Sequence, residues 1–150
     1  MRSLQKLVLF GSQDPSGDGV QPHQRHKFPA SLSQLKNLTY LDLGRNDLDE
    51  MPAFVKDLPK LKWLHFAFND KLKRVPEFLA NLKDLEMLGL ASDGLDDIPD
   101  FLNAMPKMTR VLLANNCAIT QNEAKMKELR KRFPKIDFDF MDQEDCPGEK

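Results

Sequence analysis

Apolar residues recur along this chain with a nearly constant spacing. Each unit reads apolar-x-x-apolar-x-apolar-x-x-polar, and full copies begin at Leu38, Leu61, Leu85 and Met108. The polar residue that closes these units stands at positions 46, 69, 93 and 116, so the period is 23 or 24 residues. A degenerate earlier copy begins at Leu4. Self-similarity of this length predicts a solenoid, in which each unit buries its apolar residues against its neighbours.

The two halves of each unit predict different local structures. In the first half, apolar and variable residues alternate with the period of a strand, so the apolar residues are expected to point inward. The second half begins with an apolar residue and a proline, as in Phe28-Pro29 and Met51-Pro52. Proline suits the first turn of a helix, where no amide donor is needed. A unit of this length leaves room for only a short helix or a 3₁₀ turn there.

These motifs resemble the leucine-rich repeat family, most closely its short intracellular class. The resemblance implies an α/β fold: a right-handed horseshoe-shaped solenoid with a parallel sheet on its concave side and short helices or 3₁₀ turns on its convex side. It also implies a ladder of stacked turn residues, whose side-chain amides satisfy backbone groups. The expected ladder is Ser12, Asn46, Asn69, Asp93 and Asn116. Asp93 is its expected weak point, because an ionised carboxylate only accepts hydrogen bonds.

The C-terminal end of the repeats is expected to carry a cap. Thr120-Gln121-Asn122-Glu123 is a capping-box pattern, which predicts a helix that Pro134 ends. Alternation over residues 136–140 predicts an edge strand with acidic residues facing outward, a protection against edge pairing. We therefore expect one leucine-rich repeat domain at 1–140, with about five repeats and a cap at 120–140. The polar segment 141–150 is expected to be disordered.

The N-terminal end lacks a comparable cap. No amphipathic helix precedes Leu4, so the first repeat would expose leucine. Three alternatives stay open: residues 11–27 fold back over this end, the chain was cut from a longer protein, or the end pairs with a second copy. Residues 11–27 are mostly polar, with Val20 as their one aliphatic residue. We therefore expect weak self-association, a homodimer through the N-terminal edge.

The composition of the chain argues against several classes of partner. The chain has 22 Lys plus Arg and 23 Asp plus Glu, without the basic excess typical of nucleic-acid binding. No apolar run approaches the roughly 18 residues that a membrane span needs. The N-terminal residues lack a signal-peptide core, so we expect a cytoplasmic protein. Cys117 and Cys146 form neither a metal-binding spacing nor a disulfide framework.

Patterns that suggest a metal-binding or catalytic site each lack a residue that such a site needs. Residues 14–19 match the opening of a calcium loop, but Arg25 stands where that loop needs a bidentate Glu. His23 and His26 lie among basic residues without a nearby Cys or carboxylate. His65 has no nucleophile in its column of the repeat. The sequence therefore predicts no catalytic residue, no metal ligand and no cofactor, and hence no enzyme.

The variable strand positions predict a binding face on the concave side. The single Trp and the single Tyr of the chain fall side by side there, with other aromatic residues, Met and Arg around them. This composition is typical of an interface core, although large side chains also fill concave surfaces that bind nothing. The predicted partner-binding residues are Tyr40, Trp63, His65, Phe68, Met87, Arg110 and Arg45. A second column, Phe54, Phe78 and Phe101, predicts a phenylalanine spine in the convex part of the core.

These observations favour a non-catalytic scaffold that binds a protein or peptide on its concave aromatic face. Such a sheet offers roughly 350 Å², against about 800 Å² per partner in a standard interface, so flanking loops would have to contribute. One alternative is a recognition domain detached from a larger effector or signalling enzyme. Another is a structural element that assembles through its N-terminal end.

Overall fold

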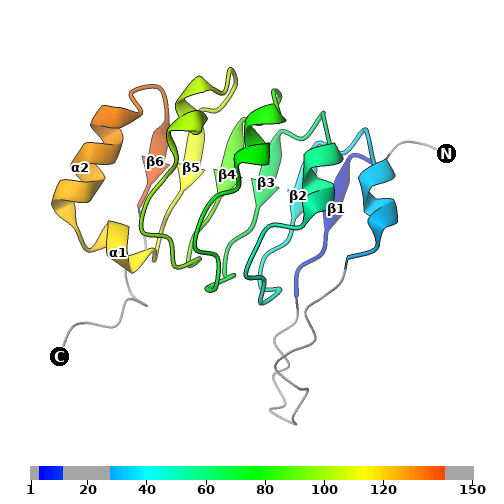
Figure 1. The fold of residues 1–150 in the computed structure, drawn as a ribbon, viewed down its shortest axis with the longest axis horizontal. Helices are drawn as coiled ribbons and strands as arrows, with labels where there is room; N and C mark the ends of the chain where they lie inside the picture. The colour runs from blue at the N-terminus through cyan, green and yellow to red at the C-terminus, as the bar shows by residue number, and fades with distance from the viewer. Residues whose placement is uncertain (1–3, 12–27, 141–150) are drawn as a thin grey trace, which may run out of the picture.

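The strands of the protein stack side by side in chain order. The computed structural model describes residues 4–11 and 28–140. Six strands form one sheet, each parallel to the next (Figure 1): β1 (Lys6–Val8), β2 (Tyr40–Asp42), β3 (Trp63–His65), β4 (Met87–Gly89), β5 (Arg110–Leu112) and β6 (Asp137–Asp139). Pairing continues beyond these bounds, since the Leu43 amide donates to the His65 carbonyl and the Arg45 amide to the Ala67 carbonyl, at 2.8 and 3.0 Å. The expected solenoid with a parallel sheet is confirmed.

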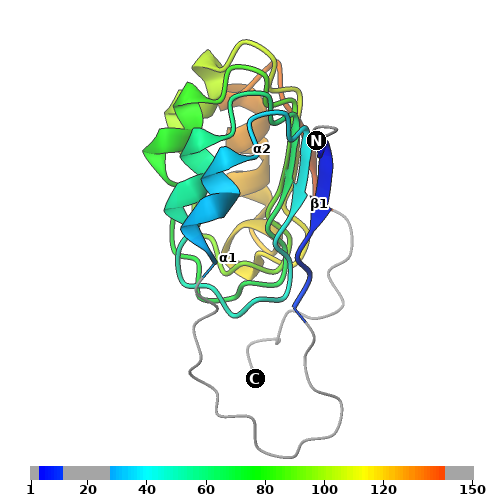
Figure 2. The same cartoon turned by 90° about the vertical axis from the view of Figure 1, so that its right-hand side faces the viewer.

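Short 3₁₀ helices form the second layer, on one face of the sheet (Figure 2). They are η1 (Ala30–Gln34), η2 (Ala53–Asp57), η3 (Glu77–Asn81) and η4 (Asp100–Ala104). Each follows a proline with extended backbone, as at Pro29 and Pro52. Proline suits this place because its missing amide leaves no donor unsatisfied at the start of a helix.

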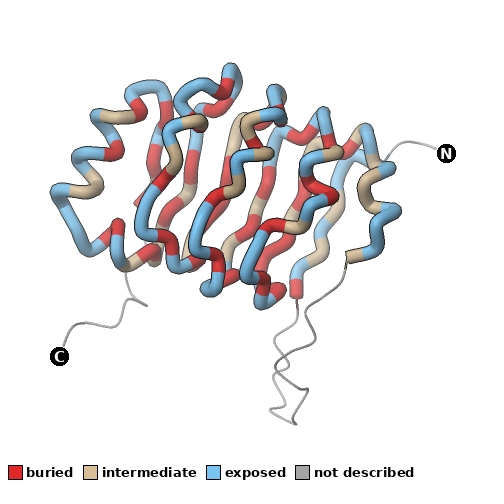
Figure 3. Tube along the Cα trace, viewed as in Figure 1, coloured by how far each residue is buried: buried red, intermediate tan, exposed pale blue. Residues whose placement is uncertain are grey.

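Buried residues lie along the strands, the turns and parts of the 3₁₀ helices (Figure 3), and they form one hydrophobic core. The inward strand residues Leu41, Leu64 and Leu88 are completely buried, as the alternating pattern predicts. The predicted phenylalanine spine is present in part. Phe54 is buried and its ring lies 5.7 Å from that of Phe28, whereas Phe78 and Phe101 are half-buried against the core.

The turn residues form the expected ladder. Asn116 Nδ2 donates to the carbonyl oxygens of Leu90 and Leu113, at 2.7 and 3.0 Å. Its Oδ1 accepts from the Leu95 amide at 2.9 Å. Asn69 behaves in the same way, donating to the carbonyls of Leu43 and Phe66. These buried amides therefore satisfy backbone groups of two successive turns.

Asp93 occupies the ladder position between these asparagines and is completely buried. Its Oδ1 accepts from the Asn69 amide at 2.8 Å, while its Oδ2 has no hydrogen-bond partner within the described residues. Burial raises the pKa of this carboxyl from 3.8 to about 8. The expected weak point of the ladder is thus visible in the structure.

The C-terminal cap consists of α1 (Cys117–Thr120), α2 (Glu123–Arg132) and β6. The cap helix α2 ends before Pro134, as predicted, but its predicted capping box is wrong. Asn122 is the N-cap, because its Oδ1 accepts from the Lys125 amide at 3.0 Å. Thr120 instead ends α1 and its hydroxyl donates to the Asn116 carbonyl at 3.2 Å. The chain makes an additional helical turn that the pattern did not indicate.

A disulfide lies at the same end of the molecule. Cys117, the first residue of α1, is disulfide-bonded, which corrects the expectation of no disulfide framework. The sequence contains one other cysteine, Cys146, which lies outside the described residues.

The first strand is better covered than the sequence suggested. Leu7 and Leu9 are half-buried and pack against the core, while Leu4 remains 45% exposed. The Gly11 amide donates to the Gly44 carbonyl at 2.9 Å, which continues the pairing of β1 with β2. The predictions for Ser12, the possible covering loop and the 141–150 tail fall outside the described residues.

Candidate functional site

The strand register places the predicted binding residues in rows on the sheet face that is turned away from the 3₁₀ helices. This is the concave face of the prediction, and we call it the open sheet face. Its first row is Lys6, Tyr40, Trp63, Met87, Arg110 and Asp137. Its second row is Val8, Asp42, His65, Gly89, Leu112 and Asp139. Because the strands are parallel and in register, residues of one row are neighbours across the sheet.

An aromatic cluster lies at the centre of β2 and β3. The Tyr40 ring centroid is 6.4 Å from that of Trp63 and 5.5 Å from that of His65. Trp63 is 41% exposed. Gly89 makes room for this arrangement, because a Cβ there would lie 2.8 Å from His65 Nδ1. The His65 imidazole thus occupies the space above β4 that the side chain of any residue other than glycine at position 89 would fill.

Charge surrounds the Tyr40 side chain. The Lys6 ammonium lies 4.5 Å from the Tyr40 ring centroid, a cation–π distance. Burial and the nearby Asp42 carboxylate both raise the pKa of the Tyr40 hydroxyl. Tyr40 is therefore neutral at physiological pH, and its hydroxyl can donate or accept a hydrogen bond.

A shallow hollow opens beside the same ring. It is lined by Lys6, Thr39, Tyr40, Lys62 and Trp63. The Lys62 ammonium also pairs with the Glu86 carboxylate at 3.3 Å, and both side chains are partly exposed. The hollow thus combines two aromatic side chains with two ammonium groups.

A second exposed cluster lies at the C-terminal ends of β1 to β3. The Arg45 guanidinium is 5.4 Å from the Phe10 ring centroid and 4.7 Å from that of Phe68. Phe10 and Phe68 are 52% and 43% exposed. Phe68 and Arg45 both have left-handed backbone, with φ of 63° and 55°, a conformation that is unfavourable for a bulky residue. Ser92 and Asn115 have the same conformation at the equivalent positions of later repeats, so it belongs to the repeat turn, and what distinguishes Phe68 is its exposed ring.

The structure thus divides the seven predicted residues into groups. Tyr40, Trp63 and His65 lie together, and half-buried Met87 follows Trp63 in the first row. Arg45 and Phe68 form the second cluster. Arg110 belongs to neither, because its guanidinium pairs with the carboxylates of β6: Asp139 at 3.2 Å and Asp137 at 3.9 Å.

Sequence reasoning left three residues out of the binding set. Lys6, Phe10 and Lys62 contact or line the two clusters. Lys6 and Phe10 belong to the degenerate first repeat. Their positions in the repeat register were the sequence signal that could have placed them on the binding face. Lys62 precedes β3, and its contribution depends on the side-chain geometry of the hollow.

Comparison with known proteins agrees with this architecture. No family model matches the chain. A solved leucine-rich repeat protein of Leptospira interrogans superposes with a TM-score of 0.64 and 28% sequence identity, over 76% of this chain and 28% of that one. The chain is a leucine-rich repeat protein.

Two curated plant proteins are also similar to parts of this leucine-rich repeat protein. The disease resistance protein UNI of Arabidopsis thaliana is 32% identical over 72 residues, which is 48% of this chain. Receptor-like protein 54 of the same species is 45% identical over 42 residues, or 28% of this chain. The matched parts amount to only 7% and 5% of those proteins.

Residues 4–11 and 28–140 contain no group of three or more His, Cys, Asp or Glu side chains that could hold a metal ion. Among the same residues, none of the helices has the length and apolar character to span a bilayer.

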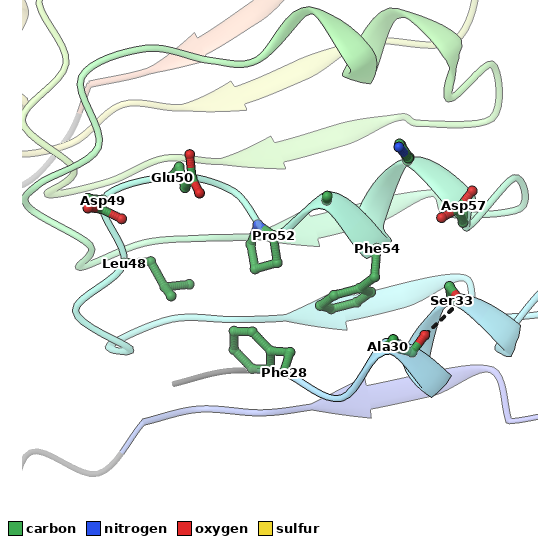
Figure 4. Close-up of a pocket in the computed structure, with 11 residues that line it drawn as sticks. Phe28, Ala30, Ser33, Leu48, Asp49, Glu50, Pro52, Phe54 and Asp57 are labelled. Atoms are coloured by element: carbon green, nitrogen blue, oxygen red, sulfur yellow. Dashed lines mark hydrogen bonds between the residues drawn. The ribbon is translucent and has the colours of Figure 1, made fainter. Parts of the chain in front are cut away.

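A further hollow lies between η1 and η2, away from the open sheet face (Figure 4). The rings of Phe28 and Phe54 form part of its wall, with Pro52 beside them, and the side chains of Asp49 and Glu50 lie at its rim. Phe28 borders residues 12–27, which lie outside the described ranges. We therefore assign this hollow no ligand.

Proposed function

We propose that this leucine-rich repeat protein is a non-catalytic scaffold that binds a protein or peptide on the open sheet face. The observation that carries the proposal is the concentration of exposed apolar side chains there. Of the five large hydrophobic residues that are exposed among the described residues, four belong to β1, β3 or the residues directly after them: Val8, Phe10, Trp63 and Phe68. Clusters of this kind on an otherwise polar surface are typical of interaction sites.

The general function of the fold supports the same conclusion. The similar proteins contain leucine-rich repeats, a fold that serves in protein interaction and is typically not catalytic. Tyr, Trp, Phe and Arg, which are present in the two clusters, are enriched in protein interfaces. Large aromatic residues carry much of the binding energy in such interfaces, so Trp63 is the expected anchor.

A second candidate is a recognition domain within a larger effector or signalling protein. It is favoured by the small fraction of the plant relatives that the chain matches, 7% and 5%. Sequencing of full-length transcripts would decide between the two: a reading frame that continues into a catalytic domain supports the second candidate. Both candidates use the same binding face.

Localisation and oligomeric state belong to the proposal as well. A cytoplasmic location and a weak homodimer through the N-terminal edge are the expectations from the sequence. The disulfide at Cys117 weighs against the first, because disulfides persist mainly in oxidising compartments. Fluorescence microscopy of the tagged protein, compared with markers of the cytoplasm and the secretory pathway, tests the location directly.

The binding face is tested by pull-down and titration with Trp63→Ala beside the wild type. Truncation of an interface anchor costs about 2 kcal/mol or more, so the Kd should rise roughly thirtyfold. The melting temperature should stay nearly unchanged, because Trp63 is 41% exposed. Lys131→Ala, on the exposed surface of α2, is the control and should bind as the wild type does. Equal binding by all three proteins would refute the proposal.

A further inference from the structure

Two cations on the open sheet face lie against aromatic rings and form no ion pair within the described residues. The Lys6 ammonium faces the Tyr40 ring at 4.5 Å. The Arg45 guanidinium lies close to the rings of both Phe10 and Phe68. Lys62 and Arg110, by contrast, form ion pairs: Lys62 with Glu86, and Arg110 with Asp137 and Asp139. Both unpaired cations are exposed.

The charge on this face is distributed unevenly along the solenoid. At the C-terminal end, Arg110 is matched by the two carboxylates of β6, Asp137 and Asp139. In the first two rows of β1 to β3 the acidic residue is Asp42, which is half-buried and accepts a hydrogen bond from the Gly44 amide at 2.9 Å. The half that exposes aromatic side chains therefore also carries the unpaired positive charge.

The spacing of the cations suggests the form of a ligand. Lys6 shares a row with Tyr40, and Arg45 follows Tyr40 by five residues on the same segment. At about 3.3 Å per residue, the backbone positions of Lys6 and Arg45 are roughly 16 Å apart along the strand direction. An extended peptide covers the same distance in about five residues, so two of its side chains can reach both cations at once.

We propose that the ligand of this site is an extended acidic segment, in which two Asp or Glu residues about five positions apart flank an apolar or aromatic stretch. This inference rests on the proposed function, because it assumes that the open sheet face binds a protein segment. One carboxylate reaches Lys6 and Lys62, the other reaches Arg45, and the apolar stretch packs against Trp63 and Tyr40. Charge complementarity of exposed groups favours fast, salt-dependent association.

Selection of peptides tests this composition without knowledge of the natural partner. A display library of random octapeptides is selected on the wild type and, in parallel, on Lys6→Gln, Arg45→Gln, Trp63→Ala and the control Lys131→Gln. The wild type and the control should enrich paired acidic residues around an aromatic or aliphatic centre. Lys6→Gln and Arg45→Gln should each lose the preference for one of the two acids, while retaining the apolar centre.

The best acidic peptide is then titrated by fluorescence anisotropy, beside a matched peptide with Gln for both acids. The Lys6→Gln and Arg45→Gln changes should each weaken the acidic peptide about tenfold and the Gln peptide less than twofold. Raising the salt concentration should weaken only the acidic peptide. Melting curves identify any variant that fails to fold, and Arg45→Lys then serves as the replacement that keeps the charge.

The outcomes separate this inference from the function on which it rests. Selected peptides that depend on Trp63 but show no acidic preference overturn the inference and leave the proposed function standing. Binding that is indifferent to Trp63 refutes both, whereas a library in which nothing is enriched overturns only the inference of an extended peptide ligand. A second copy of the chain is the other possible occupant, since β6 carries Asp137 and Asp139. Self-association that Asp137→Asn abolishes and that the acidic peptide inhibits would show that a second copy binds there, and would overturn the inference of a separate ligand.

Discussion

Asp93 is the ladder residue whose hydrogen bonding differs most clearly from that of the asparagines at the equivalent positions. Asn at the equivalent positions donates to two carbonyl oxygens, whereas the Asp93 Oδ2 finds no partner among the described residues. A buried polar atom without a hydrogen bond costs about 1–3 kcal/mol. Asp93→Asn should therefore raise the free energy of unfolding at neutral pH by an amount in this range, measured by denaturant titration.

The pH dependence provides a second test of the same residue. In the unfolded chain the Asp93 carboxyl loses its proton near pH 3.8, while in the folded protein it retains it up to about pH 8. The folded state thus binds more protons over this interval, so wild-type stability should fall between about pH 4 and about pH 8 and level off above it. Asp93→Asn should lack this component. If the free energies of unfolding of the wild type and Asp93→Asn changed in parallel with pH, the raised pKa that burial gives Asp93 would be contradicted.

A substitution at Phe68 can separate an effect on stability from an effect on partner binding. Its φ of 63° is unfavourable for a bulky side chain but well tolerated by Asn. Phe68→Asn should keep or raise the melting temperature while weakening partner binding at least tenfold. Ser92→Asn is the matched control, because Ser92 has the same backbone conformation, with φ of 56°, outside both aromatic clusters. Loss of binding in both variants would point to the turn geometry and not to the ring.

Some residue-level features were accessible from the sequence and others were not. The repeat phase alone placed Tyr40, Trp63 and His65 together, because strand register follows directly from the period. The pairing of Arg110 with β6 was not predicted, since it depends on where the cap strand joins the sheet. The left-handed backbone at Phe68 is likewise invisible in a sequence, because the residue type there disfavours it.

At the scale of elements, β1 is the strand that the described structure leaves most exposed. Among the described residues it pairs only with β2, and Leu4 beside it is 45% exposed. Burial of a leucine contributes about 1.5–3 kcal/mol, which favours contact with a second molecule. We predict weak self-association that rises with concentration in analytical ultracentrifugation and falls in Leu4→Lys. A protein that stays monomeric throughout the series would contradict this prediction.

Arg132 contributes several of the polar contacts that join the cap helix α2 to the repeats, beside the Lys125–Asp97 pair at 3.0 Å. Arg132 pairs with Asp97 at 3.0 Å and with Asp100 at 2.5 Å, and it donates to the Ile98 carbonyl at 2.7 Å. Individual surface ion pairs contribute little, but here three contacts share one side chain. Arg132→Ala should lower the free energy of unfolding by about 1–2 kcal/mol. Lys127→Ala, which removes a single exposed pair within α2, should change it by less than about 0.5 kcal/mol.

At the scale of the whole molecule, the fold followed from the sequence almost completely. The period, the prolines and the ladder residues each indicate the same stacked unit, so local and global signals agree. The candidate site followed only in part. Its aromatic centre was predicted, whereas its confinement to β1, β2 and β3 became visible only when the β6 carboxylates were placed beside Arg110.

The parallel stacking of strands in chain order has a consequence for how such a protein can change in length. Both exposed clusters belong to β1, β2, β3 and the residues beside them, and the disulfide-bearing cap belongs to the opposite end. Each repeat contacts mainly its neighbours. A duplicated repeat inserted between β4 and β5 would therefore lengthen the molecule by one strand spacing, about 4.8 Å, and leave both exposed clusters unaltered. Gene duplication would then change the length of the solenoid while the proposed binding face is inherited intact.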